Sequence, residues 1–236
     1  MGETIIALDF GNKEETLAFL DLFKDENEKP FVKIGMELFY SEGPDIVREI
    51  KRRGHKIFLD LKLYDIPNTV KRAMRSLSNL DVDIVNLHAA GGSRMMGEAL
   101  EGLTREDGTR PLLIAVTILT STSEEALHDE MLIPTPMEDT IKHYAKTASE
   151  AGLDGVVCSP LEAAGVKEVC GAKFLTVTPG VRFADSGKDD QVRITTPARA
   201  REIGSDYIVV GRPITRADNP VEAYKRCQKE FLGIKN

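Results

Sequence analysis

Short runs of apolar, largely β-branched residues recur along the 236-residue chain, and most are nearly continuous rather than alternating. Strands of a parallel sheet have this pattern because helices cover both of their faces. We therefore predict eight buried parallel strands. They span residues 4–10, 31–35, 56–63, 83–89, 111–119, 154–159, 173–179 and 206–212.

Amphipathic, charge-bearing segments with helical spacing lie between these runs. Eight strands alternating with eight helices predict an α/β fold, a single (β/α)8 TIM barrel over residues 1–236. A doubly wound open sheet is the alternative, but no glycine-rich turn follows the first predicted strand. The predicted helices span residues 13–24, 44–53, 66–79, 93–104, 138–151, 161–169, 196–203 and 220–231.

Charged side chains occur where the predicted strands end, which in such a barrel is the side of the active site. Asp60 and Lys62 are two residues apart in FLDLKLYDIPNTV, so regular alternation would put them on one face. Asp65 follows at the strand end, and Lys33 ends the neighbouring strand. Lysines among carboxylates are expected to stay protonated, which makes them proton donors rather than Schiff-base nucleophiles.

Two structural readings of the same residues remain open. The Asp-x-Lys pair could be a solvated ion pair at a strand end. Asp65 could serve only as the N-cap of the helix that Ile66 and Pro67 begin. Asp65 could also fill two roles, as the N-cap of this helix and as a charged residue of the site.

The last two units indicate a phosphate site, because barrels often bind phosphate with the loops after strands seven and eight. Each loop offers a glycine for close backbone approach and an arginine for bidentate contact, in TPGVR and in GRPIT. The polar segment 182–191 has the composition of a lid over that phosphate.

Composition narrows the partners. A net charge of −7 does not favour nucleic acid or anionic membranes, and no apolar run approaches the length of a spanning helix. The three cysteines lack metal-ligand spacing, and the chain starts without a signal-peptide pattern, so we predict a reduced, cytoplasmic protein. No metal-site spacing or Rossmann or Walker pattern occurs. His88 is either a supporting site residue or a core histidine, whereas His55 is expected at the surface.

Across nearly its whole length the chain resembles the orotidine 5′-phosphate decarboxylase family, of the compact bacterial type. The combination of Asp-x-Lys-x-x-Asp-Ile-Pro with Leu-Thr-Ser and Pro-Gly-Val-Arg is specific to that family. The matching segments are IIALDF, FVKIGMELF, LDLKLYDIPNTV, NLHAAGG, IAVTILTSTS, TVTPGVR, DDQVRITTP and IVVGRPIT.

The resemblance implies a cofactor-free conversion of orotidine 5′-monophosphate to UMP and CO2, the last step of de novo UMP synthesis. Lys62 would protonate C6 of the pyrimidine, and Asp60 would lie near the departing carboxylate. It further implies a homodimer with shared sites, in which the other subunit supplies three residues. The implied roles are Asp65, Ile66 and Thr69 from the other subunit, Asp9 and Lys33 at the ribose, Thr120 at the pyrimidine, and Arg182, Gln191, Gly211 and Arg212 at the phosphate.

Three rival functions stay open. Magnesium-dependent sugar-phosphate decarboxylases and hexulose phosphate synthases share the Asp-x-Lys-x-x-Asp pattern, but they are expected to hold the metal with acids, where this chain has Lys33. A class I aldolase would use Lys62 as a Schiff base. A silent phosphate-ligand sensor would keep the arginines but not the acid–lysine cluster.

Overall fold

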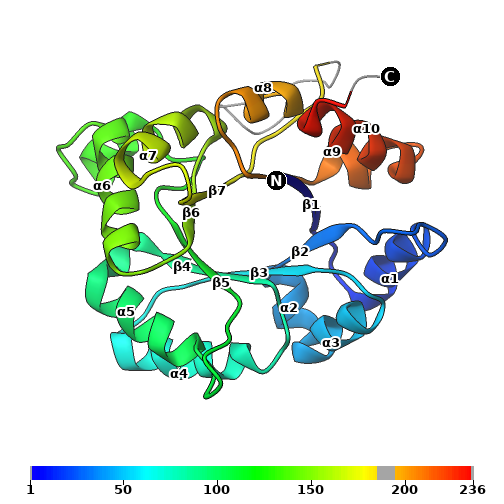
Figure 1. Ribbon diagram of the computed structural model, residues 1–236, viewed down its shortest axis with the longest axis horizontal. Helices are drawn as coiled ribbons and strands as arrows, with labels where there is room; N and C mark the ends of the chain where they lie inside the picture. The colour runs from blue at the N-terminus through cyan, green and yellow to red at the C-terminus, as the bar shows by residue number, and fades with distance from the viewer. Residues whose placement is uncertain (1, 185–194, 235–236) are drawn as a thin grey trace.

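The computed structural model describes residues 2–184 and 195–234 of the chain. Its eight strands are all parallel, and they pair in sequence order, with β1 closing the ring against β8. Figure 1 looks through this ring, around which the helices lie. The predicted (β/α)8 barrel is therefore confirmed. The strands are β1 Glu3–Leu8, β2 Phe31–Gly35, β3 Ile57–Leu63, β4 Ile84–His88, β5 Leu112–Val116, β6 Gly155–Val157, β7 Leu175–Thr178 and β8 Tyr207–Val210.

Each predicted helix is present, with shifted ends, and short helices occur in addition to them. α2 and α9 follow β2 and β8 directly, and a π-helical turn occupies the long segment after β5. Among the described residues no helix is both long enough and apolar enough to span a membrane. The helices are α1 Lys13–Asp21, α2 Met36–Glu42, α3 Pro44–Arg52, α4 Pro67–Ser78, η1 Ala89–Gly91, α5 Gly92–Leu103, η2 Ala126–Glu130, α6 Met137–Glu150, η3 Pro160–Glu162, α7 Ala163–Cys170, α8 Pro197–Glu202, α9 Arg212–Thr215 and α10 Pro220–Leu232.

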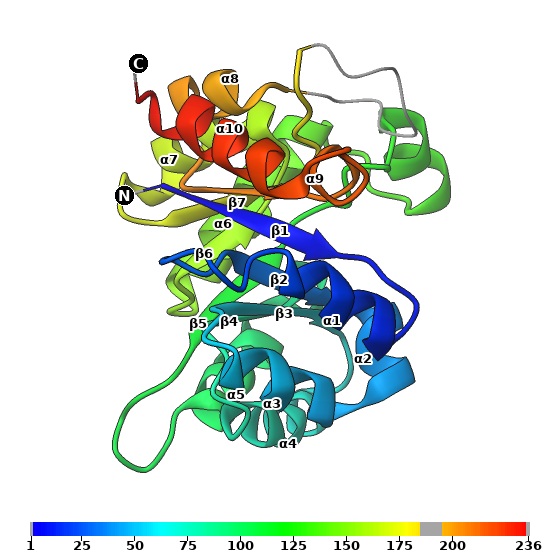
Figure 2. The same ribbon diagram turned by 90° about the vertical axis from the view of Figure 1, so that its right-hand side faces the viewer.

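Two hydrophobic cores support the barrel. The larger core fills the space between strands and helices, and the smaller one fills the interior of the barrel with residues such as Ile5, Phe58 and Val177. All strands except β2 are shorter than predicted, so that polar residues such as Asp9 lie just beyond a strand end. The side view in Figure 2 shows that the strands share one direction, so their carboxyl ends open on one side of the molecule.

β3 loses its regular pairing where the predicted site begins. Leu59 pairs with Val85 and Leu63 with Leu87, so four steps along β3 match two steps along β4. The extra residues form a bulge, in which Lys62 has a φ of +52°. Non-glycine residues rarely adopt this conformation. The bulge, not simple alternation, therefore sets the direction of the Lys62 side chain.

Helices α4 and α5 pack closely at Gly102, which is buried. A Cβ atom there would lie inside van der Waals contact of the carbonyl oxygen of Lys71 in α4. The backbone of α4 cannot move aside as the end of a flexible side chain can. The absence of a side chain at Gly102 is thus required for this helix pair.

We predict that Gly102→Ala lowers the free energy of unfolding by about 2 kcal/mol through overpacking. Gly97→Ala is the control, because a Cβ at that position of α5 would meet no described atom within 4 Å outside the adjoining part of its own helix. There the better helix propensity of alanine should raise stability by about 0.5–1 kcal/mol. Urea unfolding followed by circular dichroism measures both. Equal effects of the two substitutions would contradict the close packing.

Candidate active site

Four charged side chains from three neighbouring strands meet at the mouth of the barrel. The Nζ atom of Lys33 lies 3.0 Å from Asp9 Oδ1 and 3.4 Å from Asp60 Oδ2. The Nζ atom of Lys62 lies 2.6 Å from Asp60 Oδ1. The predicted cluster is thus brought together, with acid and base alternating from Asp9 to Lys62. The Asp60–Lys62 pair is not a solvated strand-end pair, because Asp60 is buried and the Lys62 side chain is 25% exposed.

The charged state of the cluster follows from its geometry. Burial alone would raise the pKa of Asp60, but the charges of Lys33 and Lys62 and hydrogen bonds outweigh it, so this pKa is lowered. Burial likewise opposes the charge on Lys33, yet Asp60 and Asp9 raise the pKa of that ammonium above its usual value. Asp60 and Lys33 therefore each require their charged neighbours, as expected for charges removed from water.

Asn86 also belongs to this cluster, and the sequence predictions missed it. Its Nδ2 atom donates to Asp60 Oδ1 at 2.7 Å, and its Oδ1 atom accepts from the backbone N–H of Lys62 at 2.8 Å. It stands in β4 with 1% of its surface exposed. The available signal was a polar residue inside the apolar run DIVNLHA, two positions before His88.

His88 lies half-buried at the end of β4, and its ring centroid is 5.8 Å from that of Tyr64. Burial lowers the pKa of His88, and the charge of Lys62 lowers it further. The ring is accordingly neutral at pH 7. This position fits a residue that supports the cluster better than one enclosed in the core.

A cavity of about 160 Å³ opens beside the cluster. Lys33, Asp60 and Lys62 line one part of it, and Thr120 borders it as predicted for a residue that contacts the substrate. Most of the remaining wall is apolar. A ligand that enters would meet a few converging charges in a poorly hydrated space, where electrostatic interactions are strong. The apolar wall comprises Phe58, Val116, Ile118, Leu119, Val157, Pro179 and Val209.

Asp65, Ile66 and Thr69 lie exposed on the rim. The Oδ1 atom of Asp65 accepts a hydrogen bond from the N–H of Ile66 at 2.6 Å, and among the described residues Asp65 forms no ion pair. The N-cap of α4 is Ile66, and α4 begins at Pro67. The N-cap reading of Asp65 is therefore wrong. Its carboxylate does not cap the N-terminus of this helix.

The predicted phosphate ligands lie at the ends of β7 and β8, with one outside the described residues. Arg182 is buried, and its Nη1 atom donates to the carbonyl of Val181 at 2.9 Å. Gly211 lies beside Asp9, since a Cβ on it would be 3.8 Å from Asp9 Oδ2. Arg212 is the first residue of α9. Gln191 falls outside residues 2–184 and 195–234, as does most of the predicted lid.

Within the described part of the chain, no three or more His, Cys, Asp or Glu side chains gather as they would around a metal ion. The acids at the mouth, Asp9 and Asp60, are each engaged by Lys33. The donor set at the mouth therefore suits an anionic organic ligand better than a divalent cation.

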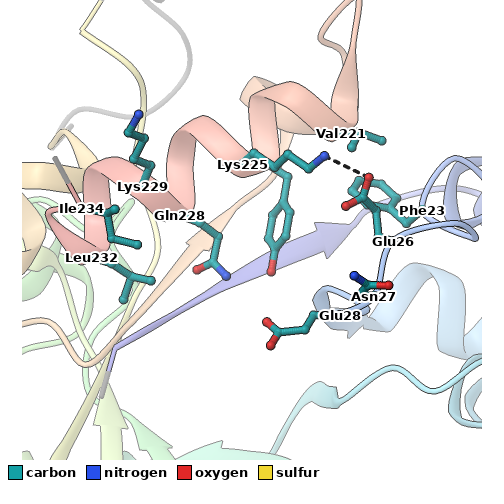
Figure 3. Close-up of a pocket in the computed structure, with 11 residues that line it drawn as sticks. Phe23, Glu26, Asn27, Glu28, Val221, Lys225, Gln228, Lys229, Leu232 and Ile234 are labelled. Carbon is teal, nitrogen blue, oxygen red and sulfur yellow. Dashed lines mark hydrogen bonds and ion pairs between the residues drawn. The ribbon is translucent and has the colours of Figure 1, made fainter. Parts of the chain in front are cut away.

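A larger groove of about 600 Å³ lies elsewhere, between α10 and the segment that follows α1 (Figure 3). Lys225 on its wall pairs with Glu26 at 3.0 Å, and the rings of Phe23 and Tyr224, which also line the groove, meet edge to face. The charges of Lys225 and Glu26 therefore neutralise each other rather than face a ligand. The smaller mouth cavity is thus the better candidate for chemistry.

Comparison with known proteins gives consistent results. The model of the orotidine 5′-phosphate decarboxylase / HUMPS family matches residues 3–227. An orotidine 5′-phosphate decarboxylase of Bacillus mycoides (strain KBAB4) is 59% identical over 233 residues, which are 98% of this chain and 97% of the relative. A relative of the same name from Bacillus cytotoxicus (strain DSM 22905 / CIP 110041 / 391-98 / NVH 391-98) is also 59% identical, with the same coverage.

Two solved structures are similar over nearly the whole chain. A crystal structure titled as orotidine 5′-phosphate decarboxylase from Lactobacillus acidophilus has a TM-score of 0.87 and 43% identity, covering 98% of this chain and 99% of that one. An uncharacterized conserved protein from Geobacillus kaustophilus has a TM-score of 0.85 and 52% identity, covering 97% and 99%.

The lowered pKa of Asp60 predicts a pH-dependent stability. The ionised carboxylate stabilises the fold above its unfolded-state pKa, and this contribution is lost as pH falls through the lower folded-state pKa. Asp60→Asn should therefore lower the unfolding free energy by about 3 kcal/mol at pH 7, because Lys33 loses a partner, and by less at pH 3, which is below the unfolded-state pKa of about 3.9.

Urea titrations at the two pH values measure this difference. The control is Asp45→Asn, which removes an exposed pair with Arg48 and should change stability by less than about 1 kcal/mol at either pH. A loss in Asp60→Asn that is the same at pH 7 and pH 3 would contradict the coupling of this carboxylate to its lysines.

Proposed function

The chain belongs to the orotidine 5′-phosphate decarboxylase / HUMPS family of enzymes, and on that premise we propose that it converts orotidine 5′-monophosphate to UMP and CO2 without a cofactor, in the last step of UMP synthesis. The observation that carries this proposal is the Lys62–Asp60 pair of 2.6 Å at the mouth cavity. In support, the pair lines the cavity, where its ammonium would lie near the reacting carbon and its carboxylate near the substrate carboxylate.

The proposed chemistry needs only a proton from the protein. The bond between C6 and the carboxylate breaks, CO2 leaves, and the electron pair stays on C6. Lys62 then donates a proton from Nζ to C6 and recovers one from solvent. A fixed ammonium stabilises negative charge that develops on C6, most strongly in a poorly hydrated cavity. Asp60 beside the departing carboxylate would add ground-state repulsion, to which we assign the smaller weight.

The rest of the substrate would extend from this cavity along the barrel mouth. Thr120, which lines the cavity, would meet the edge of the pyrimidine. Lys33 and Asp9, which bond to each other at 3.0 Å, would hold the ribose hydroxyls. Arg182, Gln191, Gly211 and Arg212 would bind the phosphate, whose binding energy is thereby available to the reacting centre.

We further propose a homodimer with shared sites, to which the partner contributes Asp65, Ile66 and Thr69. In support, these residues are exposed, and large apolar side chains on the segments that follow β2 and β3 are exposed as well. Exposed fractions reach 63% for Tyr64 and 67% for Ile66, and Tyr40 of α2 is 70% exposed. Such exposed apolar side chains are typical of an interface. The cytoplasmic location stays a prediction.

Lys62→Ala should lower kcat by at least about 10³-fold, because it removes both the proton and the charge at C6. Binding of UMP, measured by calorimetry, should change little. Loss of absorbance as orotidine monophosphate is consumed measures turnover. Lys225→Ala, a surface lysine on α10 paired with Glu26, is the control and should retain full activity.

EDTA distinguishes this reaction from the magnesium-dependent members of the wider group. The enzyme should keep its turnover after EDTA treatment and desalting. A requirement for magnesium, or an adduct of Lys62 trapped by borohydride with a carbonyl substrate, would overturn the cofactor-free reaction.

Mixing variants tests the shared site. Chains with Asp65→Ala and chains with Lys62→Ala should each be inactive, but exchange of subunits assembles one intact site in each mixed dimer. We expect recovery of up to about one quarter of the parent activity at equal mixing, since half of the dimers are mixed and each has one of two sites intact. No recovery, despite subunit exchange shown by mass spectrometry of tagged chains, would rule out the shared site.

A further inference from the structure

Asn86 connects the two central groups of the candidate site through one buried amide. Its oxygen accepts a hydrogen bond from the backbone N–H of Lys62, and its NH2 group donates one to the carboxylate of Asp60. We propose that Asn86 is a positioning residue, which holds the β3 bulge and the Asp60 carboxylate in the arrangement that aims the Lys62 ammonium at the substrate. This role rests on the proposed decarboxylation.

The orientation of the amide follows from its partners. An ionised carboxylate only accepts hydrogen bonds, so the NH2 group of Asn86 must face Asp60. A backbone N–H only donates, so the amide oxygen must face Lys62. Both requirements are met at once, at 2.7 Å and 2.8 Å. With the amide flipped, its NH2 group would face the N–H of Lys62, donor against donor. Its oxygen would face the carboxylate of Asp60, acceptor against acceptor.

The bond to Lys62 supports a conformation that the backbone would otherwise avoid. Lys62 has a φ of +52° and lies in the bulge between the pairs Leu59↔Val85 and Leu63↔Leu87. Such strain persists only where the surroundings fix it. The N–H of Lys62 points at Asn86 on the neighbouring strand, so the amide oxygen of Asn86 replaces the missing ladder bond.

The bond to Asp60 fixes the rotation of its carboxylate. Oδ1 receives both Lys62 Nζ, at 2.6 Å, and Asn86 Nδ2, at 2.7 Å, while Oδ2 faces Lys33 Nζ at 3.4 Å. Without the amide, Oδ1 would have a single donor, on a flexible side chain. Asn86 thereby keeps one oxygen toward Lys62 and the other toward Lys33.

Packing alone does not explain an amide at this position. The position is 1% exposed, and the strand residues on either side, Val85 and Leu87, are apolar and fully buried. A leucine of similar size would fill the volume, whereas a buried amide costs free energy unless it is bonded. Asn86 makes its hydrogen bonds to the candidate catalytic groups, which is where a positioning role requires them.

Asn86→Asp distinguishes a positioning role from a purely structural one. The new carboxyl keeps the shape and the acceptor for the Lys62 N–H, but it donates to Asp60 only when protonated. The anion of Asp60 is held by Lys33 and Lys62, so the proton should reside on the new carboxyl, whose pKa should be raised by the charge of Asp60 and by burial.

We expect kcat of Asn86→Asp at pH 8 to be about 10²-fold below the parent, with a smaller change in KM, because misplaced groups affect mainly the chemical step. The ratio of its kcat to that of the parent should rise about tenfold between pH 8 and pH 5.5. Taking the ratio cancels the titration of His88, which faces Lys62 in both proteins. Asn86→Leu should show a similar loss that does not vary with pH.

Asn79→Asp makes the same change at the exposed C-cap of α4 and should leave kcat unchanged at both pH values. Circular dichroism and UMP binding establish that each variant is folded. An unreduced kcat in Asn86→Asp, or a loss in it that is independent of pH, overturns the positioning role, and this holds even where Asn86→Leu fails to fold. Absence of turnover in the parent itself would instead overturn the proposed function.

Discussion

The ionised carboxylate of Asp60 is the group on which the mouth of the barrel depends. It lies between the ammonium groups of Lys33 and Lys62, and it would not remain charged at 7% exposure without them. The lysines depend on it in turn, because Lys33 is itself buried. The site is therefore a mutually stabilised set of charges rather than a collection of separate residues, and a change in one member alters the state of the others.

Closure of the barrel explains why these charges meet. Asp9, Lys33 and Asp60 belong to β1, β2 and β3, or follow them directly, and these strands are neighbours in the ring. Their carboxyl ends must therefore converge, and this convergence could be predicted from nearly continuous apolar runs that end in polar residues. For this reason the fold class, the strand order and the acid–lysine cluster could be predicted from the sequence.

Details that depend on contacts between strands were not predictable in this way. The bulge in β3 is defined by its offset against β4, which no periodicity in β3 itself reveals. Asn86 was missed because it stands in an apolar run, where its partners become visible only across the barrel. His55, expected at the surface, is buried, with Nδ1 2.9 Å from the carbonyl oxygen of Pro30 and a pKa lowered chiefly by burial. The polar residues beside His55 in the sequence therefore do not determine whether its ring is exposed.

The pairing of the two lysines is unequal within one chain, and this asymmetry bears on the proposed dimer. Lys33 contacts the carboxylates of both Asp9 and Asp60, whereas among the described residues Lys62 pairs with Asp60 alone. A substrate carboxylate that approaches Asp60 would meet repulsion from it, and Lys62 would be the nearest counter-charge. A second carboxylate, from Asp65 of another copy, would then hold the ammonium as CO2 departs and the charge at C6 develops. In the proposed reaction, the strained backbone of Lys62 and the exposed rim would together keep this ammonium directed at the reacting carbon.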